Sequence, residues 1–547
     1  MKNNFLSKLF NNILIAIVIT LLFICVEQIY RSYNDILSFN LNIKSFAEQF
    51  LINFFIVSII KQRAIFITYV ILALLVWFQI AHFAYFGTWI FPLEYYLFFT
   101  QFKETYDTFK TVTDIVIIPT IMIIVLLISI YFILKKTEDR RLKIPFLSFF
   151  LIAFIVFIPA RVYIKDSKKG HRPNVEYYPI KNSVLNIGYL LGNIIPRKMS
   201  GHSGLEQKII PTPKLIERNP NINVIMIMGE SLNRKFMSLY KYKIKSTPFL
   251  DSIKDDNNFT FLKGIASGVV TDVAIPSFFN MIKRPDGVPQ IISTNTCLFK
   301  MAKNNGFNTY FYSAQSQSQL SHLKSYLCTK WINNYSDGTE NTKDVDKPAL
   351  DQFLLKKIDS IDFSKPVFAT LHQRASHTPF IDTFPKEFEI YTKKNIKDKT
   401  ISQDTIDYLN SIRYTDYILS QIIKKIKEKT TRPTYFLFTS DHTSNVGDPN
   451  RKGHGKLSFN DIYKVPFFIY SINEAKNIKS KFSKEFPYIS HYQMSNVVAH
   501  LLGYKEVHNH FNRKDDFFVC GSDISGLAGF LKVSFDKDGK QITKLME

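Results

Sequence analysis

Cysteine is scarce in this chain, and its scarcity sets a first limit on the class of protein. Only four cysteines occur among 547 residues, at positions 25, 297, 328 and 520. So few cysteines exclude a domain held together by a dense disulfide framework. Cys25 lies in an apolar run. If the part of the chain that carries the other three is extracytoplasmic, Cys297 and Cys328 are the first candidates for a disulfide.

Acidic residues are also few relative to basic ones. The chain has 46 Asp and Glu against 69 Lys and Arg, a formal net charge of +23. A basic balance suits an anionic partner, either nucleic acid or an anionic lipid surface. No nucleic-acid-binding motif accompanies the charge, so we expect a lipid surface and no nucleic acid. The alternative is a lysine-rich composition without a specific role.

Long apolar runs are confined to the first 165 residues. A membrane-spanning helix needs about 20 apolar residues. Because the first run has no small-residue cleavage site before Glu27, a cleaved signal peptide is excluded. The second run is short, and its alternative is a re-entrant or interfacial segment. We predict a transmembrane domain of five helices over residues 1–163, from apolar runs at about 9–26, 47–60, 64–86, 113–134 and 144–163.

Basic residues in the short loops predict the orientation of these helices. Lys2 and Lys8 precede the first run, Lys61 and Arg63 separate the second from the third, and residues 135–143 carry five more basic side chains. With five spans, all of these loops fall on the cytoplasmic side. Everything after about residue 165 then lies outside, in the periplasm of a bacterium with two membranes.

Residues 164–204 are predicted to link this domain to the rest of the chain. Within them, residues 182–195 alternate between apolar and polar side chains. This pattern is typical of an amphipathic helix on the membrane surface. The alternative is an ordinary linker packed against the following domain.

Residues 205–547 alternate apolar runs of strand type with helical patterns, which predicts a mainly parallel sheet covered by helices on both faces. A long helix is expected over residues 406–427. In such folds, ligands bind at the carboxyl ends of the strands. The predicted strands are Asn223–Met228, Thr309–Tyr312, Val367–Leu371, Tyr435–Phe438 and Pro466–Tyr470.

Residues of metal-ligand type follow several of these strands. Glu230 comes just after the first, His377 after the third, and Asp441 with His442 after the fourth, while His454 lies in a glycine-flanked loop. Carboxylate oxygen and imidazole nitrogen are good ligands for zinc. One such residue would carry little weight, but five at equivalent positions predict a metal site.

Thr271 stands at the predicted start of a helix, with Asp272 in its first turn. A threonine hydroxyl is a poor nucleophile until a base or a metal removes its proton. A helix N-terminus also favours an anionic phosphate. Considered alone, Thr271 is better explained as a helix cap. Beside the predicted metal ligands, it is a candidate nucleophile.

Together these segments resemble the lipid A phosphoethanolamine transferases of the alkaline phosphatase/sulfatase superfamily, which include the colistin-resistance enzymes. The resemblance implies a five-helix transmembrane domain followed by an α/β alkaline-phosphatase/sulfatase-like domain with a mainly parallel central sheet. It is carried by Gly229-Glu230-Ser231, Thr271 with Ile275-Pro276, Leu371-His372-Gln373 with His377-Thr-Pro379, Ser440-Asp441-His442 and Gly453-His454-Gly455.

The resemblance also implies a role for each matching residue. One tightly bound Zn²⁺ would be held by Glu230, Thr271, Asp441 and His442, with Thr271 as the catalytic nucleophile. His377 and His454 would assist catalysis, hold a second metal or contact substrate. Glu104 and Ser316 are further candidates for substrate binding. The implied protein is a monomer of the bacterial inner membrane that takes phosphoethanolamine from phosphatidylethanolamine and passes it to lipid A or another lipopolysaccharide or surface glycan acceptor.

Departures from the family pattern leave the acceptor open. The family often has Ser-Cys-Gly-Thr at the nucleophile, where this chain has Ser267-Gly-Val-Val-Thr271, and a family lysine falls at Gln319. One alternative is a phosphoglycerol transferase with the same centre. Another is a non-catalytic lipid-binding relative. A sulfatase activity is disfavoured because Thr271-Asp-Val does not fit a Cys/Ser-x-Pro-x-Arg motif.

Overall fold

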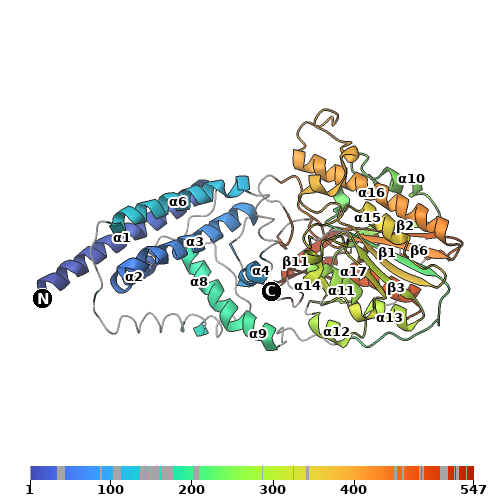
Figure 1. The fold of residues 1–547 in the computed structure, drawn as a ribbon, viewed down its shortest axis with the longest axis horizontal. Helices are drawn as coiled ribbons and strands as arrows, with labels where there is room; N and C mark the ends of the chain where they lie inside the picture. Colours follow the sequence, from blue (N-terminus) through green and yellow to red (C-terminus); the bar gives the residue numbers. More distant parts are fainter. Residues whose placement is uncertain are drawn as a thin grey trace. The chain divides into compact units, whose positions relative to one another are not determined.

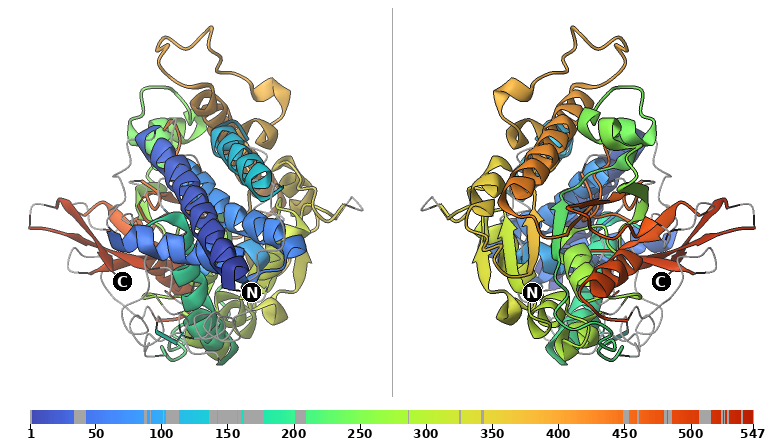
Figure 2. Two further views of the ribbon diagram at one scale, coloured as in Figure 1. Left: turned by 90° about the vertical axis from the view of Figure 1, so that its left-hand side faces the viewer. Right: turned by 90° about the vertical axis from the view of Figure 1, so that its right-hand side faces the viewer.

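A computed structural model divides the chain into two compact units, Met1–Gly204 and Leu205–Glu547. Each unit is described by itself (Figures 1 and 2). The structure describes residues 2–33, 43–86, 89–90, 92–100, 102, 113–135, 142, 157, 160–161, 177–200, 209–285, 287–324, 326–340, 344–448, 453–458, 461–479, 482, 486–505, 515–522, 524, 526, 529–537 and 539–546.

The first unit is helical wherever it is described in regular structure. Three of its helices are long and apolar enough to cross a membrane, over Phe5–Tyr33, Ala64–Ala84 and Thr113–Lys135. The second predicted span is a helix of only 17 residues, and the fifth, at 144–163, lies almost wholly outside the described residues. The helices are α1 Lys2–Tyr33, α2 Ile43–Ile59, α3 Gln62–Phe86, α4 Pro92–Thr100, α6 Thr113–Lys135, α8 Pro179–Tyr189 and α9 Ile195–Ser200.

The segment predicted as an amphipathic linker helix is helical. Helix α8 passes through a π-helical turn at Leu190–Ile194 into α9. Its buried face is partly polar, with Asn182, Ser183 and Asn186 fully enclosed. Asn186 donates to the carbonyl of Ile90, 2.5 Å away. The helix therefore packs within the first unit through polar as well as apolar contacts.

The second unit is built on an eight-stranded sheet of order β4-β3-β5-β1-β6-β7-β2-β8. Only β7 runs against its neighbours β6 and β2; all other described pairings in this sheet are parallel. The prediction of a mainly parallel α/β domain is confirmed. The strands are β1 Asn223–Gly229, β2 Phe259–Ile265, β3 Asn308–Ser313, β4 Asn334–Ser336, β5 Val367–His372, β6 Thr434–Ser440, β7 Pro466–Ile472 and β8 Tyr488–Ser490.

Helices cover both faces of this sheet (Figure 1). Alternate residues of β1 point into different cores, because successive side chains on a strand face opposite ways. Val224 and Met226 enter the core beneath α11, α13 and α17. Ile225 and Ile227 enter the core beneath α15 and α16. The helices are α10 Pro248–Ile253, α11 Thr271–Phe279, α12 Val288–Ser293, α13 Leu298–Asn304, α14 Gln317–Lys324, α15 Gln352–Ile358, α16 Gln403–Lys429 and α17 His491–Leu501.

A second, antiparallel sheet ends the chain. It consists of β9 Phe517–Cys520, β10 Phe530–Phe535 and β11 Gln541–Met546. Its first strand reaches the loop before α11, because the Cys520 backbone N–H donates to the carbonyl of Ser267 at 2.8 Å. This small sheet therefore supports the loop that leads to Thr271.

The cysteines are free in the structure, but the thiols of Cys297 and Cys328, the pair expected to be bridged, lie close enough to hydrogen-bond to each other. Cys297 is buried at the start of α13, where its sulfur accepts the backbone N–H of Lys300 at 3.4 Å. The Cys328 thiol donates to Asn280 Oδ1 at 3.1 Å. Both sulfur atoms therefore have hydrogen-bond partners without a covalent link.

Candidate metal centre

Two parallel strands of the central sheet deliver the acidic ligands to one point. Gly229, the last residue of β1, pairs with Ser440, the last residue of β6. The residues that follow, Glu230 on one side and Asp441 with His442 on the other, are therefore neighbours. All three are fully buried, and their ligand atoms lie within 4.8 Å of one another. This is the edge where open α/β sheets bind ligands.

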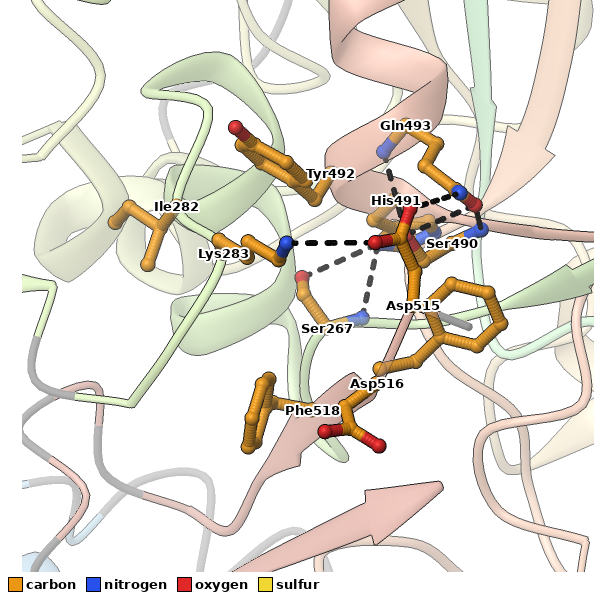
Figure 3. A pocket seen from close by; sticks show the side chains of 11 residues that line it. Ser267, Ile282, Lys283, Ser490, His491, Tyr492, Gln493, Asp515, Asp516 and Phe518 are labelled. Atoms are coloured by element: carbon orange, nitrogen blue, oxygen red, sulfur yellow. Dashed lines mark hydrogen bonds and ion pairs between the residues drawn. The ribbon is translucent and has the colours of Figure 1, made fainter. Parts of the chain in front are cut away.

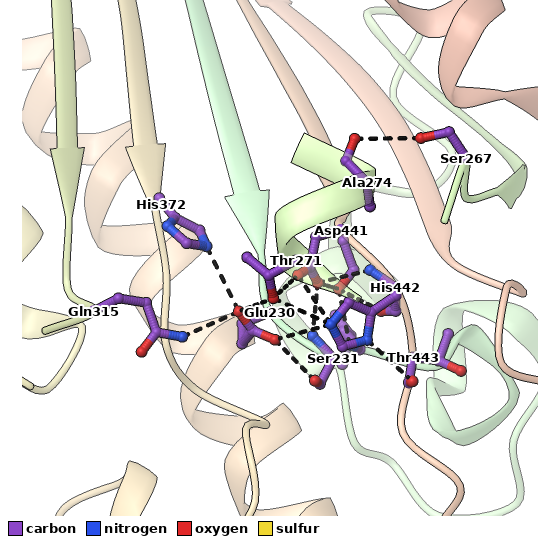
Figure 4. A network of polar contacts seen from close by, with 12 residues as sticks. Glu230, Ser231, Ser267, Thr271, Ala274, Gln315, His372, Asp441, His442 and Thr443 are labelled. Atoms are coloured by element: carbon purple, nitrogen blue, oxygen red, sulfur yellow. Dashed lines mark hydrogen bonds and ion pairs between the residues drawn. The ribbon is translucent and has the colours of Figure 1, made fainter. Parts of the chain in front are cut away.

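Thr271, the first residue of α11, brings its hydroxyl into the same group (Figure 4). Its Oγ1 lies 2.8 Å from Asp441 Oδ2, 3.2 Å from His442 Nε2 and 3.4 Å from Glu230 Oε2. Val270, the residue before the helix, has no side-chain cap. The Thr271 side chain therefore turns toward the acidic group, at a helix N-terminus whose positive potential favours an anion.

Local hydrogen bonds fix the Asp441 carboxylate. Its Oδ1 accepts the backbone N–H groups of Ser231 at 3.0 Å and His442 at 2.7 Å. Ser231 has a positive φ of 53°, and this turn aims its N–H at the carboxylate. Oδ2 is thereby left facing Thr271.

The electrostatics of the group favour a cation. Burial, together with the neighbouring Glu230, raises the pKa of Asp441 to about 6. Burial alone would raise the pKa of Glu230 too, but the neighbouring imidazoles of His372 and His442 hold that pKa below its ordinary value. Two buried carboxylates beside an imidazole nitrogen and a hydroxyl form a donor set that suits a divalent metal ion. The residues present therefore fit a metal site.

His454 and His377 lie next to this group. The ring centroids of His442 and His454 are 4.5 Å apart, and those of His377 and His454 are 6.0 Å apart. Burial lowers the pKa of both outer histidines. His377 Nδ1 lies 2.6 Å from the carbonyl oxygen of Thr378. Since a carbonyl only accepts, Nδ1 carries the proton and Nε2 keeps a lone pair.

The two other predicted site residues are not part of this group. Ser316 Oγ accepts the backbone N–H of Gln319 at 3.4 Å and donates to Gln319 Oε1 at 3.2 Å. Ser316 therefore serves the first turn of α14, and its predicted substrate contact stays a prediction. Glu104 lies outside the described residues, so its predicted role stays a prediction as well.

The structure adds Gln315 and His372, which the sequence analysis did not assign. Gln315 Nε2 donates to Glu230 Oε2 at 3.0 Å. His372 Nε2 lies 3.7 Å from the same oxygen, and its Nδ1 lies 2.9 Å from Ser313 Oγ. His372 ends β5 and Gln315 follows β3, so the rule that ligands gather at carboxyl strand ends could have found both.

Fold and site together define an α/β domain with a buried centre suited to a metal ion. The family model described as Sulfatase matches residues 222–504. This region is more than half of the chain, and the chain belongs to the sulfatase family.

The curated relatives narrow this class. The chain is 22% identical over 384 residues to phosphoethanolamine transferase EptA of Helicobacter pylori, covering 69% of this chain and 70% of that protein. It is 20% identical over 361 residues to the Kdo(2)-lipid A phosphoethanolamine 7''-transferase of Escherichia coli, covering 62% of each. The resemblance to phosphoethanolamine transferases, and with it the expectation of an enzyme of this class, is therefore confirmed.

A solved structure extends the fold comparison to nearly the whole chain. It is the integral membrane protein lipooligosaccharide phosphoethanolamine transferase A from Neisseria meningitidis, with a TM-score of 0.54 and 14% identity. The match covers 92% of this chain and 96% of that one. At this identity the match supports the shared fold, with apolar N-terminal helices ahead of the α/β domain.

Proposed function

We propose that this protein transfers phosphoethanolamine from phosphatidylethanolamine to lipid A, or to another lipopolysaccharide or surface glycan acceptor, with Thr271 as the nucleophile. One observation carries the proposal. The Thr271 hydroxyl starts a helix and lies within 3.4 Å of Glu230, Asp441 and His442. The two curated relatives, both phosphoethanolamine transferases by name, support the choice of transferred group.

A zinc ion is the proposed cofactor, because this donor set of carboxylate, imidazole and hydroxyl groups suits Zn²⁺. Glu230, Thr271, Asp441 and His442 would hold it. When bound, zinc supplies positive charge that lowers the pKa of the hydroxyl and polarises a phosphoryl oxygen. We further propose that His377 and His454 can hold a second metal ion.

The first step forms a bond between Thr271 Oγ1 and the donor phosphorus. The phosphorus–oxygen bond to the glycerol breaks, and diacylglycerol leaves with a proton on its oxygen. The Thr271 hydroxyl gives up its own proton, and the Asp441 carboxylate 2.8 Å away orients that hydroxyl. The N-terminus of α11, where Thr271 stands, favours the negative charge of the phosphate.

The second step releases the group to the acceptor. An acceptor oxygen attacks the phosphorus of phosphoethanolamine-Thr271, its proton leaves, and the Thr271 hydroxyl is restored. His377 is placed to take that proton, since its Nε2 keeps a lone pair. Neutral His454 lies between His377 and His442 and can assist in the same way.

We place the reaction at the bacterial inner membrane, with residues after about 165 in the periplasm. Three described helices long enough to span a membrane support an anchored enzyme, and basic residues such as Lys61 predict the orientation. Outside the cytoplasm, a membrane phospholipid is an available phosphoryl donor. Anchoring beside the membrane would raise the effective concentration of both lipid substrates.

Replacement of the nucleophile tests this function. Thr271→Ala should lower transfer by at least about 1,000-fold, because the substitution removes the oxygen that attacks the phosphorus. Thr271→Ser keeps a hydroxyl and should keep measurable transfer. The assay is mass spectrometry of lipid A and of the protein after incubation with phosphatidylethanolamine. Transfer by Thr271→Ala at the native rate contradicts the mechanism, and a phosphoglycerol adduct in place of phosphoethanolamine contradicts the donor.

A further inference from the structure

His491 is fully buried beside the metal centre and is not one of its ligands. It is the first residue of α17 and directly follows β8. A capping box fixes this helix start, because Ser490 and Gln493 exchange backbone and side-chain hydrogen bonds. The helix cap therefore fixes the backbone of His491, and hydrogen bonds at the two ring nitrogens fix its imidazole.

The two ring nitrogens bond to different segments of the site. Nε2 lies 2.9 Å from the carbonyl oxygen of Ser440. Nδ1 lies 3.2 Å from the backbone nitrogen of Ser267 (Figure 3). A carbonyl only accepts and a backbone N–H only donates, so Nε2 carries the proton and Nδ1 accepts. Both bonds hold together only in this neutral tautomer. Burial, which lowers the pKa of His491 to about 3, keeps the ring in that form.

One of these two segments leads to Asp441 and His442 of the metal centre, and the other leads to Thr271. Ser440 ends β6 and directly precedes Asp441 and His442. Ser267 opens the loop that leads to Thr271, and its hydroxyl donates to the carbonyl of Ala274 in α11 at 3.2 Å. One imidazole therefore ties the ligand strand to the loop and helix of the nucleophile.

Packing around this link leaves little room for adjustment. The His491 ring meets Phe278 of α11 edge to face, with centroids 5.6 Å apart and an interplanar angle of 89°. A Cβ added to Gly268 would lie 2.7 Å from Val273 Cγ1. The cavity beside Ser267 and His491 measures about 10 Å³, room for roughly one water molecule. The loop before Thr271 is thus packed closely against α11 and His491.

We propose that His491 is a positioning residue for the metal centre. It sets the distance between Thr271 and the pair Asp441–His442 without contacting the metal or the substrate. The inference deepens the proposed function and rests on it for the effect of His491 on phosphoethanolamine transfer. The effect of His491 on metal binding depends only on the centre formed by Glu230, Thr271, Asp441 and His442, whatever group the enzyme transfers.

Two substitutions in the full-length, detergent-solubilised protein test this role. His491→Phe fills the space but makes neither hydrogen bond, while His491→Gln can still donate an amide N–H to Ser440. We expect zinc affinity to fall about 10-fold or more in the Phe variant and less in the Gln variant, the range found when a partner of a metal ligand is lost. Competition with a chromophoric chelator measures zinc affinity, and the visible spectrum of the Co²⁺-substituted protein reports ligand geometry.

Asn496→Ala is the matched control. Asn496 is buried in the same helix, and its Nδ2 donates to the helix's own Tyr492 carbonyl at 2.7 Å. This variant should lose thermal stability while keeping native zinc affinity and the native Co²⁺ spectrum. A weakened, spectrally altered site in the His491 variants but not in the control supports a positioning role.

Native zinc affinity in both His491 variants overturns the proposal. If His491→Phe does not fold, the Gln variant decides alone: native affinity and spectrum refute the proposal, and at least about threefold weaker binding supports it. Failure of the proposed function is recognised separately, since Thr271→Ala would then transfer at the native rate whatever the His491 variants do to zinc.

Discussion

At the scale of single residues, the centre is organised around Glu230 and Asp441, and hydrogen bonds orient both carboxylates. Ser231 and His442 hold Asp441 through backbone N–H groups. Glu230 Oε1 accepts the Ser231 hydroxyl at 2.9 Å, and Oε2 accepts Gln315. Carboxylates oriented in this way are ready to bind a metal without rearrangement, which favours affinity.

Gln315 offers a direct test of this orientation. Gln315→Leu removes the donor to Glu230 Oε2 while keeping the size of the side chain, so we expect zinc affinity to fall roughly 10-fold. Chelator competition measures the change. Ser316→Ala, one position along, removes a bond within the first turn of α14 and should leave zinc affinity unchanged. Equal affinities in the Gln315 and Ser316 variants would show that Gln315 does not orient Glu230.

At the scale of elements, the helices of the first unit enclose charge as well as apolar surface. Arg31 and Glu27 of α1 form an ion pair of 2.8 Å, with side chains only 1% and 3% exposed. Arg31 also donates to the carbonyl of Tyr177 at 3.0 Å and lies 5.2 Å from the ring centre of Trp89. This pair therefore joins α1 to the chain just before α8.

Breaking this pair should destabilise the first unit. Arg31→Gln leaves the Glu27 carboxylate buried without its partner, at an expected cost of about 3–5 kcal/mol. Thermal unfolding of the detergent-solubilised protein should show the loss. The double variant Glu27→Gln/Arg31→Gln removes both charges and should be less destabilised than the single one. A single variant as stable as the wild type would mean that the pair contributes nothing.

The elements of the second unit were largely predictable, because their side-chain periodicity is local. The predicted strand Val367–Leu371 appears as β5 Val367–His372, and the predicted helix 406–427 as α16 Gln403–Lys429. The strands β2, β4 and β8 of the central sheet and the three strands of the small sheet were not predicted. Because β4 and β8 have only three residues each, they show no periodicity. His491 was missed as well, since its position depends on the pairing of β8 with β2.

At the scale of the whole molecule, the two units have separate cores. The apolar cores on the two faces of the central sheet draw their members from residues after 205. A third core is formed by α1, α2, α3 and α6 with the start of α8. Because each unit buries its own apolar surface, the second should fold without the first.

Truncation tests that independence and the role of the first unit. We expect residues 205–547 alone to fold, to bind zinc with native affinity and to be modified at Thr271 by a water-soluble phosphoethanolamine donor. Transfer from phosphatidylethanolamine in vesicles should fall by at least about 100-fold, because the lipid is no longer held near the centre. Undiminished transfer from vesicles would show that the first unit does not assist the reaction.

The sequence by itself determined the alternation of strands and helices and the candidates Glu230, Thr271, Asp441 and His442. Strand periodicity is local, and parallel strands bring their carboxyl ends to one edge. Only the tertiary structure decided which of these side chains meet, how Gln315 and His372 orient Glu230, and how His491 joins two distant segments. Those contacts link residues up to 224 positions apart, and no local pattern encodes a pairing across such a distance.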